Sequence, residues 1–132
     1  MTSPLTRQQL REFKALLNDR FLTLRGEIQD ALLRNDDEHY ADIAGQVTDM
    51  EDAALADLIV DLDLAEIDRD VEEIRDIDAA LMRIAESRYG ICIDCDEAIP
   101  VERLRAYPTA KRCIDCQRRY ERTHTPGNAA TL

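Results

Sequence analysis

Four cysteines, arranged as two pairs, constrain the fold of this chain more than any other feature. Cys92 and Cys95 form one C-x2-C pair, and Cys113 and Cys116 form a second, 17 residues further on. Each C-x2-C turn can direct both of its sulfurs to one point, and two such turns make the closed tetrahedral site that Zn²⁺ occupies in structural centres. The spacing therefore predicts one structural zinc ion held by all four thiolates.

Other uses of these cysteines fit the sequence less well. The residues from Met1 to Leu5 lack the basic stretch and apolar core of a secretory signal, and no apolar run has the roughly 20 residues needed to cross a bilayer. We therefore expect a cytoplasmic protein whose thiols stay reduced. Four thiolates would leave no open position for a catalytic water, so we expect no enzyme. A redox C-x2-C pair would need a βαβ context, which the pattern lacks, but thiolate oxidation with release of zinc stays open.

A long amphipathic helix is predicted near the start of the chain. Thr6 and Gln9 match a capping box, and Leu5 can pack on Leu10 as a hydrophobic staple. Apolar residues then recur at spacings of three and four up to about Arg34. They are Leu10, Phe13, Leu17, Phe21, Leu24, Ile28 and Ala31 or Leu32. Asn35 could end this helix in a left-handed conformation.

A second, longer helix is predicted from Thr48 or Asp49 to Tyr89, with Gly90 as its left-handed cap. The segment contains no proline or glycine, and its apolar residues again recur every three or four positions. Between the two long helices, residues 38–44 could form a short helical turn that ends at Gly45. Two long helices joined by a modest loop should pack antiparallel, so we predict an all-α fold with a coiled-coil helical hairpin.

The predicted organisation has three parts. Residues 1–89 form the hairpin, with its tip at about 35–54; residues 90–124 form the four-cysteine zinc module; and residues 125–132 form a flexible tail. The module should contain a short helix starting near Pro100 and a final helix running to about His124. His39 and His124 are outside the cysteine pattern, and we interpret both as solvated surface residues rather than ligands.

The charge of the chain argues against nucleic acid as its main partner. The 28 acidic residues exceed the 17 lysines and arginines, which gives a net charge of −11. DNA would repel such a surface, because affinity for DNA comes mainly from neutralising phosphates. A locally basic stretch runs from Lys111 to Arg122. We therefore expect a protein partner, with no direct DNA binding and no membrane association, and we expect the chain to be a monomer.

The zinc module resembles that of the DksA/TraR family of bacterial transcription regulators. The resemblance covers about residues 49–120. It is carried by Tyr89-Gly90-Ile91-Cys92-Ile93-Asp94-Cys95, Ile99-Pro100, Arg103-Leu104, Pro108-Thr109-Ala110 and Cys113-Ile114-Asp115-Cys116. The resemblance implies a coiled-coil hairpin that emerges from a zinc-bearing end and inserts into the secondary channel of RNA polymerase. The residue after Cys95 is Asp96, where the family commonly has glycine; Asp tolerates a left-handed backbone better than most residues.

By the same resemblance, the hairpin tip would carry the family pattern D-x-x-D-x-A. It reads here Asp49-Met50-Glu51-Asp52-Ala53-Ala54, at the family's distance from the first cysteine. Asp52 and Ala54 would then contact the polymerase near its active centre, supported by Asp49. The simpler interpretation is that Asp49 and Asp52 only cap a helix. The two interpretations are compatible, because a cap fixes where exposed carboxylates point.

The resemblance also bears on ppGpp, which some family members bind together with polymerase through cations. At the corresponding positions this chain has Asp76, Tyr107 and Gln117. Because phosphate recognition needs Lys or Arg, we predict weak or no dependence on ppGpp. Two other hypotheses stay open: a zinc-stabilised adaptor that binds another protein through the acidic hairpin, and a nucleic-acid-binding zinc finger that uses the Lys111–Arg122 segment.

Overall fold

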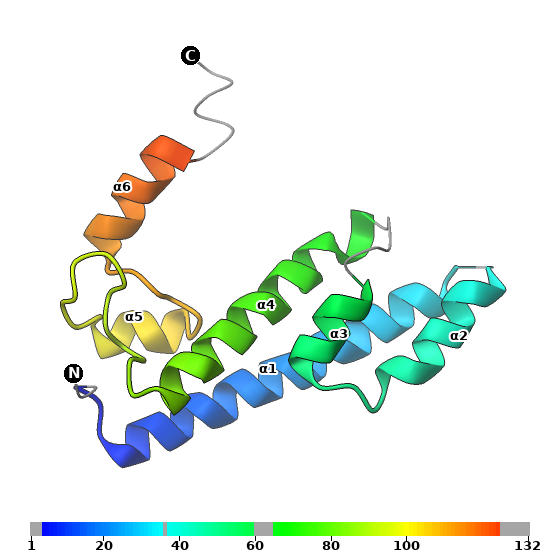
Figure 1. The fold of residues 1–132 in the computed structure, drawn as a ribbon, viewed down its shortest axis with the longest axis horizontal. Helices are drawn as coiled ribbons and strands as arrows, with labels where there is room; N and C mark the ends of the chain where they lie inside the picture. The colour runs from blue at the N-terminus through cyan, green and yellow to red at the C-terminus, as the bar shows by residue number, and fades with distance from the viewer. Residues whose placement is uncertain (1–3, 36, 60–64, 125–132) are drawn as a thin grey trace.

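The computed structural model describes residues 4–35, 37–59 and 65–124, and these residues form an almost entirely helical protein (Figure 1). The six helices are α1 (Arg7–Leu33), α2 (Glu38–Val47), α3 (Asp52–Ile59), α4 (Ala65–Ala85), α5 (Val101–Ala106) and α6 (Ile114–His124). Within this described part, β pairing is limited to one bridge between Ile91 and Ala98. The predicted all-α class is confirmed. None of the described helices is long and apolar enough to span a lipid bilayer.

Helix α1 begins as the sequence predicts. The Thr6 hydroxyl accepts a hydrogen bond from the Gln9 amide (3.0 Å), and the Gln9 side chain accepts one from the Thr6 amide (2.9 Å). The predicted left-handed end at Asn35 was wrong. The chain leaves α1 through Arg34, which is right-handed (φ −72°), and the Asn35 amide donates to the carbonyl of Leu32.

Helix α2 is longer than the predicted turn. The Asp37 carboxylate accepts a hydrogen bond from the His39 amide (2.8 Å) and caps the start of the helix. The helix continues through Gly45, the predicted end, to Val47. Burial explains the extension, because Ala44 and Val47 are almost fully buried and α2 packs along α1. Tertiary packing here outweighs the roughly 1 kcal/mol that glycine costs in a helix.

The predicted single helix over residues 49–89 was wrong. Residues 52–59 and 65–85 form two helices, and α3 folds back to pack against α4 (Figure 1). Thr48, predicted as the start of the helix, is instead the C-cap of α2. Folding back buries apolar side chains that a protruding helix would leave in water: Leu55, Ala56 and Ile59 are at most 4% exposed. The hydrophobic effect thus favours a short bundle over one straight arm.

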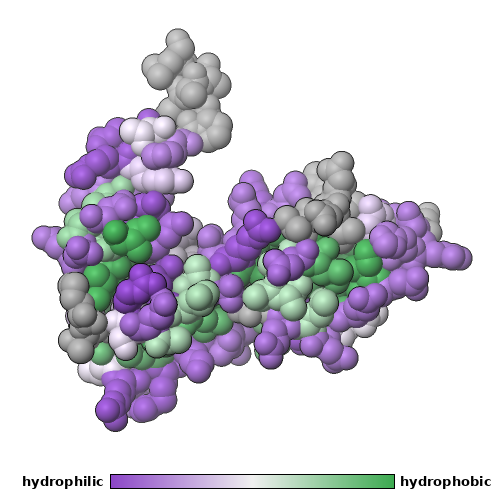
Figure 2. All heavy atoms as spheres, in the orientation of Figure 1, coloured by the Kyte–Doolittle hydropathy of each residue, from purple (hydrophilic) through white to green (hydrophobic). Residues whose placement is uncertain are grey.

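The two longest helices, α1 and α4, lie side by side (Figure 1). Helix α2 packs on α1, and α3 packs on α4. Figure 2 shows hydrophilic residues over most of the visible face, with hydrophobic residues gathered in patches between them. The buried stripe of α1 confirms the predicted one and consists of Phe13, Leu17, Phe21, Leu24, Ile28, Ala31 and Leu32.

The connection from α4 to the zinc module is a tight left-handed turn. Helix α4 ends at Ala85, and Ser87, not Gly90, is the first left-handed residue (φ 60°). The amides of Arg88 and Tyr89 both donate to the carbonyl of Arg83. Gly90 is also left-handed (φ 84°), and a Cβ there would lie 3.1 Å from the side chain of Leu5. Both the conformation and this close approach require glycine at the position.

Candidate metal centre and acidic turn

Two turns and one helix start position the four cysteine sulfurs. In the first turn, Asp96 adopts the left-handed conformation expected for it (φ 62°), and its amide donates to the carbonyl of Cys92 (3.0 Å). The Ile93 amide donates to the carbonyl of Lys111 (2.9 Å), which joins the first turn to the chain entering the second. The second turn leads directly into α6, where the Gln117 amide donates to the carbonyl of Cys113.

The four sulfurs are arranged as a zinc site requires. Every pair lies within 4.8 Å, and the sulfurs of Cys95 and Cys113 are 3.8 Å apart. This is close to the separation of about 3.8 Å that tetrahedral geometry gives for Zn–S bonds of about 2.3 Å. It is far longer than the bond of about 2.0 Å in a disulfide. Cys92, Cys95, Cys113 and Cys116 therefore fit one tetrahedral zinc ion, as the spacing predicted.

The four neighbouring thiols differ in pKa, because each is affected by the others and by its own burial. Burial raises the pKa of the Cys92 thiol. Hydrogen bonds with the backbone of Cys113, Cys95 and Asp94 outweigh this effect and lower the pKa to about 7. The neighbouring Cys113 thiol, together with desolvation, raises the pKa of Cys116 to about 12. Without a cation, the cluster cannot hold four negative charges at neutral pH. A divalent ion supplies the missing positive charge, so the donor set is one that metal binding completes.

Side chains around the cysteines tie the two turns together and to the helical pair. The Arg112 guanidinium, largely buried, pairs with Asp94 of the first turn (2.7 Å) and lies over the Tyr120 ring of α6 (3.9 Å). The buried Tyr89 ring contacts Phe13 of α1 (5.6 Å between centroids), and its hydroxyl donates to the carbonyl of Pro108 (2.6 Å). The sequence predicted Tyr89 as the end of a helix and as part of the family motif, but not these contacts.

The predicted polymerase-contacting residues lie on the flank of the helical pair, not at its end. Asp49 is in the turn between α2 and α3, Asp52 is the first residue of α3, and Ala54 is exposed on α3. Asp49 lines a cleft with Phe21, in the middle of α1, and with Leu81, near the C-terminal end of α4, so the turn lies beside the middle of α1. The structure thus brings the three residues together, but places them short of the end of α1.

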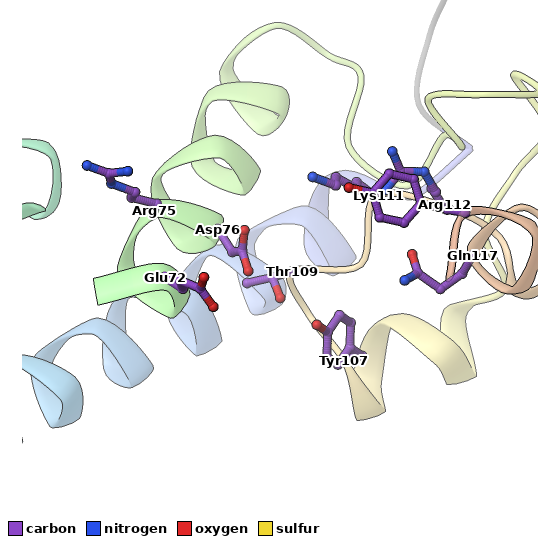
Figure 3. A pocket seen from close by; sticks show the side chains of 9 residues that line it. Glu72, Arg75, Asp76, Tyr107, Thr109, Lys111, Arg112 and Gln117 are labelled. Atoms are coloured by element: carbon purple, nitrogen blue, oxygen red, sulfur yellow. The ribbon is translucent and has the colours of Figure 1, made fainter. Parts of the chain in front are cut away.

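The three residues considered for ppGpp line one cleft of about 410 Å³ between α4 and the zinc module. Figure 3 shows Asp76 on α4, Tyr107 after α5 and Gln117 on α6 around this opening. Desolvation raises the pKa of Asp76, and the nearby Lys111 opposes part of that increase. The cleft also contains Glu72, Arg75, Lys111 and Arg112. Lys111 and Arg112 belong to the basic stretch noted in the sequence, and the fold brings them to the same cleft as Arg75 of α4.

Both histidines are exposed, and neither belongs to the cysteine cluster. The His124 ring stacks on Tyr120 at the end of α6 (4.1 Å between centroids). Helix α6 extends away from the helical pair (Figure 1), and its residues from Arg118 to His124 are all exposed. The basic stretch that the sequence singled out therefore lies mostly on a free helix.

Comparison with known proteins agrees with this geometry. A family model described as the prokaryotic DksA/TraR C4-type zinc finger matches residues 87–122. The RNA polymerase-binding transcription factor DksA of Salmonella typhimurium is 32% identical over 109 residues, which cover 83% of this chain and 69% of that protein. This chain belongs to the DksA/TraR family. The recognition made from the cysteine motif is confirmed.

Two further relatives place the chain within the family. The DksA of Caulobacter vibrioides is 36% identical over 90 residues, covering 68% of this chain and 58% of that protein. The solved structure of transcription factor DksA2 from Pseudomonas aeruginosa matches with a TM-score of 0.59 and 25% identity, covering 91% of this chain and 88% of that one. The match includes both helical arms and the zinc module, so the family's fold class is shared.

Proposed function

We propose that this protein regulates transcription by binding RNA polymerase, with its helical hairpin inserted into the secondary channel. The observation that carries the proposal is the 32% identity to a factor named for binding RNA polymerase, over 83% of this chain. An alignment of that length includes the helical arms as well as the zinc module. The proposed role is regulatory and not enzymatic, since four thiolates fill the metal's coordination sphere.

The helical pair has the form that such insertion requires. Helix α1 has 27 residues, which corresponds to a rod of about 40 Å at 1.5 Å per residue. Arg20 of α1 and Glu73 of α4 join the two helices through a two-point ion pair (2.5 and 3.0 Å). At the other end, the cysteine cluster and the buried Tyr89 fix the helices to the module. When bound there, zinc supplies the cross-link that lets so small a module fold.

The proposed contacts with polymerase are Asp49, Asp52 and Ala54. An acidic group presented beside the polymerase active centre would favour some of its conformations over others and so change the lifetime of open promoter complexes. This is allosteric regulation in the strict sense, because an effector shifts an equilibrium only by binding one state better than another. The high acidity of the hairpin also opposes direct DNA binding.

The proposal includes independence from ppGpp. Two carboxylates, Glu72 and Asp76, line the cleft in which family members use cations, and negative charge there repels a polyphosphate. Of the cations present, Arg112 is already paired with Asp94. Adding ppGpp should therefore leave the affinity of this protein for polymerase unchanged, as measured by titration of labelled protein. A tighter complex in the presence of ppGpp would contradict this part of the proposal.

Binding and competition test the main proposal. The full-length zinc protein should bind core RNA polymerase, and a transcript-cleavage factor that enters the same channel should displace it. Asp52→Asn with Ala54→Thr should retain binding but lose the effect on promoter-complex lifetime. Asp57→Asn is the matched control, because Asp57 is an exposed carboxylate on the same helix outside the motif. Equal effects of all three proteins on promoter complexes would exclude the acidic motif, and absence of binding would exclude the function.

A further inference from the structure

Two arginine side chains are buried beside the cysteine cluster. Among the described residues, the buried polar or charged side chains are Arg83 and Arg112, which are 7% and 8% exposed. Each lines a cavity or cleft together with a cysteine, Arg83 with Cys92 and Arg112 with Cys116. Arginine keeps its positive charge in proteins, and such a charge is almost never fully buried unless it is paired. Each arginine therefore needs an anion close to it.

The two arginines differ in the partner of their charge. Arg112 pairs with the carboxylate of Asp94, at 2.7 Å. The Arg83 guanidinium instead donates a hydrogen bond to a neutral group, the carbonyl of Thr109, at 3.4 Å. In the part of the chain that the structure describes, Arg83 forms no ion pair with a carboxylate. Burial lowers the pKa of Arg83, because desolvation disfavours its charged form, and Asp76, about two turns earlier on α4, offsets this only in part.

The cavity beside Arg83 has a volume of about 240 Å³ and lies where the end of α4 meets the first cysteine turn. Its lining residues are Arg83, Arg88, Ile91, Cys92, Ile93 and Asp96. Arg88 is exposed and paired with Glu86, and Asp96 is exposed, so water screens both charges. Cys92 is buried, so the charge of a thiolate there is screened much less. The metal centre is therefore the anion that Arg83 can offset most strongly.

Backbone hydrogen bonds hold Arg83 and Cys92 in place relative to each other. The Arg83 carbonyl accepts bonds from the amides of Arg88 (2.8 Å) and Tyr89 (3.1 Å), which form the turn after α4. The Cys92 amide donates to the carbonyl of Glu97 (2.8 Å), which closes the first cysteine turn. The position of Arg83 beside the first pair of cysteines is thus set by the backbone of these two turns.

Four thiolates around one Zn²⁺ carry a net charge of about −2. Because Cys92 and Cys116 are buried, water screens only part of this charge. We propose that Arg83 is the counter-ion of the zinc centre: its guanidinium offsets part of the negative charge of the thiolates and so increases their affinity for zinc. Groups just outside the ligands of a metal commonly change its affinity by roughly 10–100-fold. This role belongs to the zinc-loaded protein itself and does not depend on contact with polymerase.

A simpler role for Arg83 follows from its place in the last turn of α4. A cation there interacts favourably with the negative end of the helix dipole. That interaction stabilises α4 with and without metal, whereas a counter-ion of the thiolates stabilises only the metal-bound state. Zinc affinity and the stability of α4 in the metal-free protein therefore distinguish the two roles.

Substitutions at position 83 separate charge from hydrogen bonding. Arg83→Gln keeps a donor for the Thr109 carbonyl but removes the charge, and we expect it to weaken zinc binding by roughly 10–100-fold. Arg83→Lys keeps the charge and should bind zinc much more tightly than Arg83→Gln. Arg75→Gln is the matched control, because Arg75 is an exposed arginine of the same helix and lines a cleft that contains no cysteine. Arg88→Gln should also have little effect, since Arg88 is exposed and paired with Glu86.

The first measurement is the zinc affinity of the full-length proteins, from competition with a chromophoric chelator. The wild type, Arg75→Gln and Arg88→Gln should bind most tightly, followed by Arg83→Lys and then by Arg83→Gln. Equal affinities of Arg83→Gln and Arg75→Gln would overturn the inference. Equal losses in Arg83→Gln and Arg83→Lys would also overturn it, since the charge would then not matter. A matching loss of stability in metal-free α4, measured by thermal melting of the helical circular dichroism signal, would assign the effect to the helix dipole instead.

The second measurement replaces zinc with Co²⁺, which reports on the sulfur atoms themselves. A cation beside the thiolates stabilises their lone-pair electrons and raises the energy of the sulfur-to-cobalt charge-transfer absorption. Arg83→Gln should therefore shift this band to longer wavelength, while Arg83→Lys and Arg75→Gln should leave it near the wild-type position. Only protein that holds metal gives the band, so a variant that folds less well still gives an answer. An unshifted band in Arg83→Gln would overturn the inference, because a weaker affinity would then arise from the fold of the module.

Discussion

Replacing Tyr89 with phenylalanine should destabilise the junction between the zinc module and the helical pair. The ring of Tyr89 is fully buried, and its hydroxyl donates to the carbonyl of Pro108 at 2.6 Å. Phenylalanine keeps the ring contact with Phe13 and removes only this hydrogen bond. Leaving a partly buried carbonyl without its donor costs about 1–3 kcal/mol. For a chain of this length, that lowers Tm by roughly 4 °C for each kcal/mol.

Urea denaturation of the zinc-loaded proteins measures this cost directly. Tyr107→Phe is the matched control, because the Tyr107 side chain is 54% exposed and water replaces its hydrogen bonds. A second readout is the phenolate absorbance during alkaline titration. Burial raises the pKa of Tyr89 to about 12, so this hydroxyl contributes stability below pH 10 that is lost as the pH rises towards 12. Equal unfolding free energies for both variants, or no loss of the late titration step in Tyr89→Phe, would refute the reasoning.

Three further predictions follow from other parts of the structure. Removing zinc with a chelator should unfold α5 and α6 but leave most of the helical signal of α1 and α4 in circular dichroism; an unchanged spectrum would contradict a structural metal. Gly90→Ala should cost about 1–2 kcal/mol in chemical denaturation because φ is 84°, whereas Gly45→Ala, inside α2 with free space around it, should stabilise by about 0.5–1 kcal/mol. Desolvation raises the pKa of Asp76, so its charge opposes folding above the unfolded pKa and the free energy of unfolding increases as the pH falls. Asp76→Asn should raise the free energy of unfolding at pH 7 by less than about 1 kcal/mol and flatten its pH dependence, and a lower free energy of unfolding would contradict this.

The parts of the fold that local rules govern could be read from the sequence. The capping box at Thr6 and the apolar stripe after it predicted α1, because both depend on residues within a few positions of one another. The same holds for the cysteine pairs, whose spacing forces the two turns to converge on one metal ion.

The packing of the second arm could not be read in this way. No glycine or proline marks the break between α3 and α4, and residues such as Leu55, Leu58 and Ile59 offer apolar side chains on more than one side of a helix. Which side becomes buried depends on which neighbour is available, and that is a property of the whole fold. The contacts of Tyr89 with Pro108 and of Gln29 with Thr48 likewise join distant positions.

The zinc module joins the start of α1 to the end of α4. Leu5, Gly90 and the cysteine turns fix how the start of α1 lies relative to the end of α4, so the relative rotation of the two helices is set there. A single-residue insertion within the last turn of α4 would rotate the rest of that helix by about 100° relative to the metal site, at 3.6 residues per turn, and turn its apolar face towards water. An insertion of the same length in the link between α1 and α2 would rotate nothing on the metal side. Related chains should therefore vary in length at the other end of the helical pair. They should keep a constant number of residues between the last turn of α4 and the first cysteine.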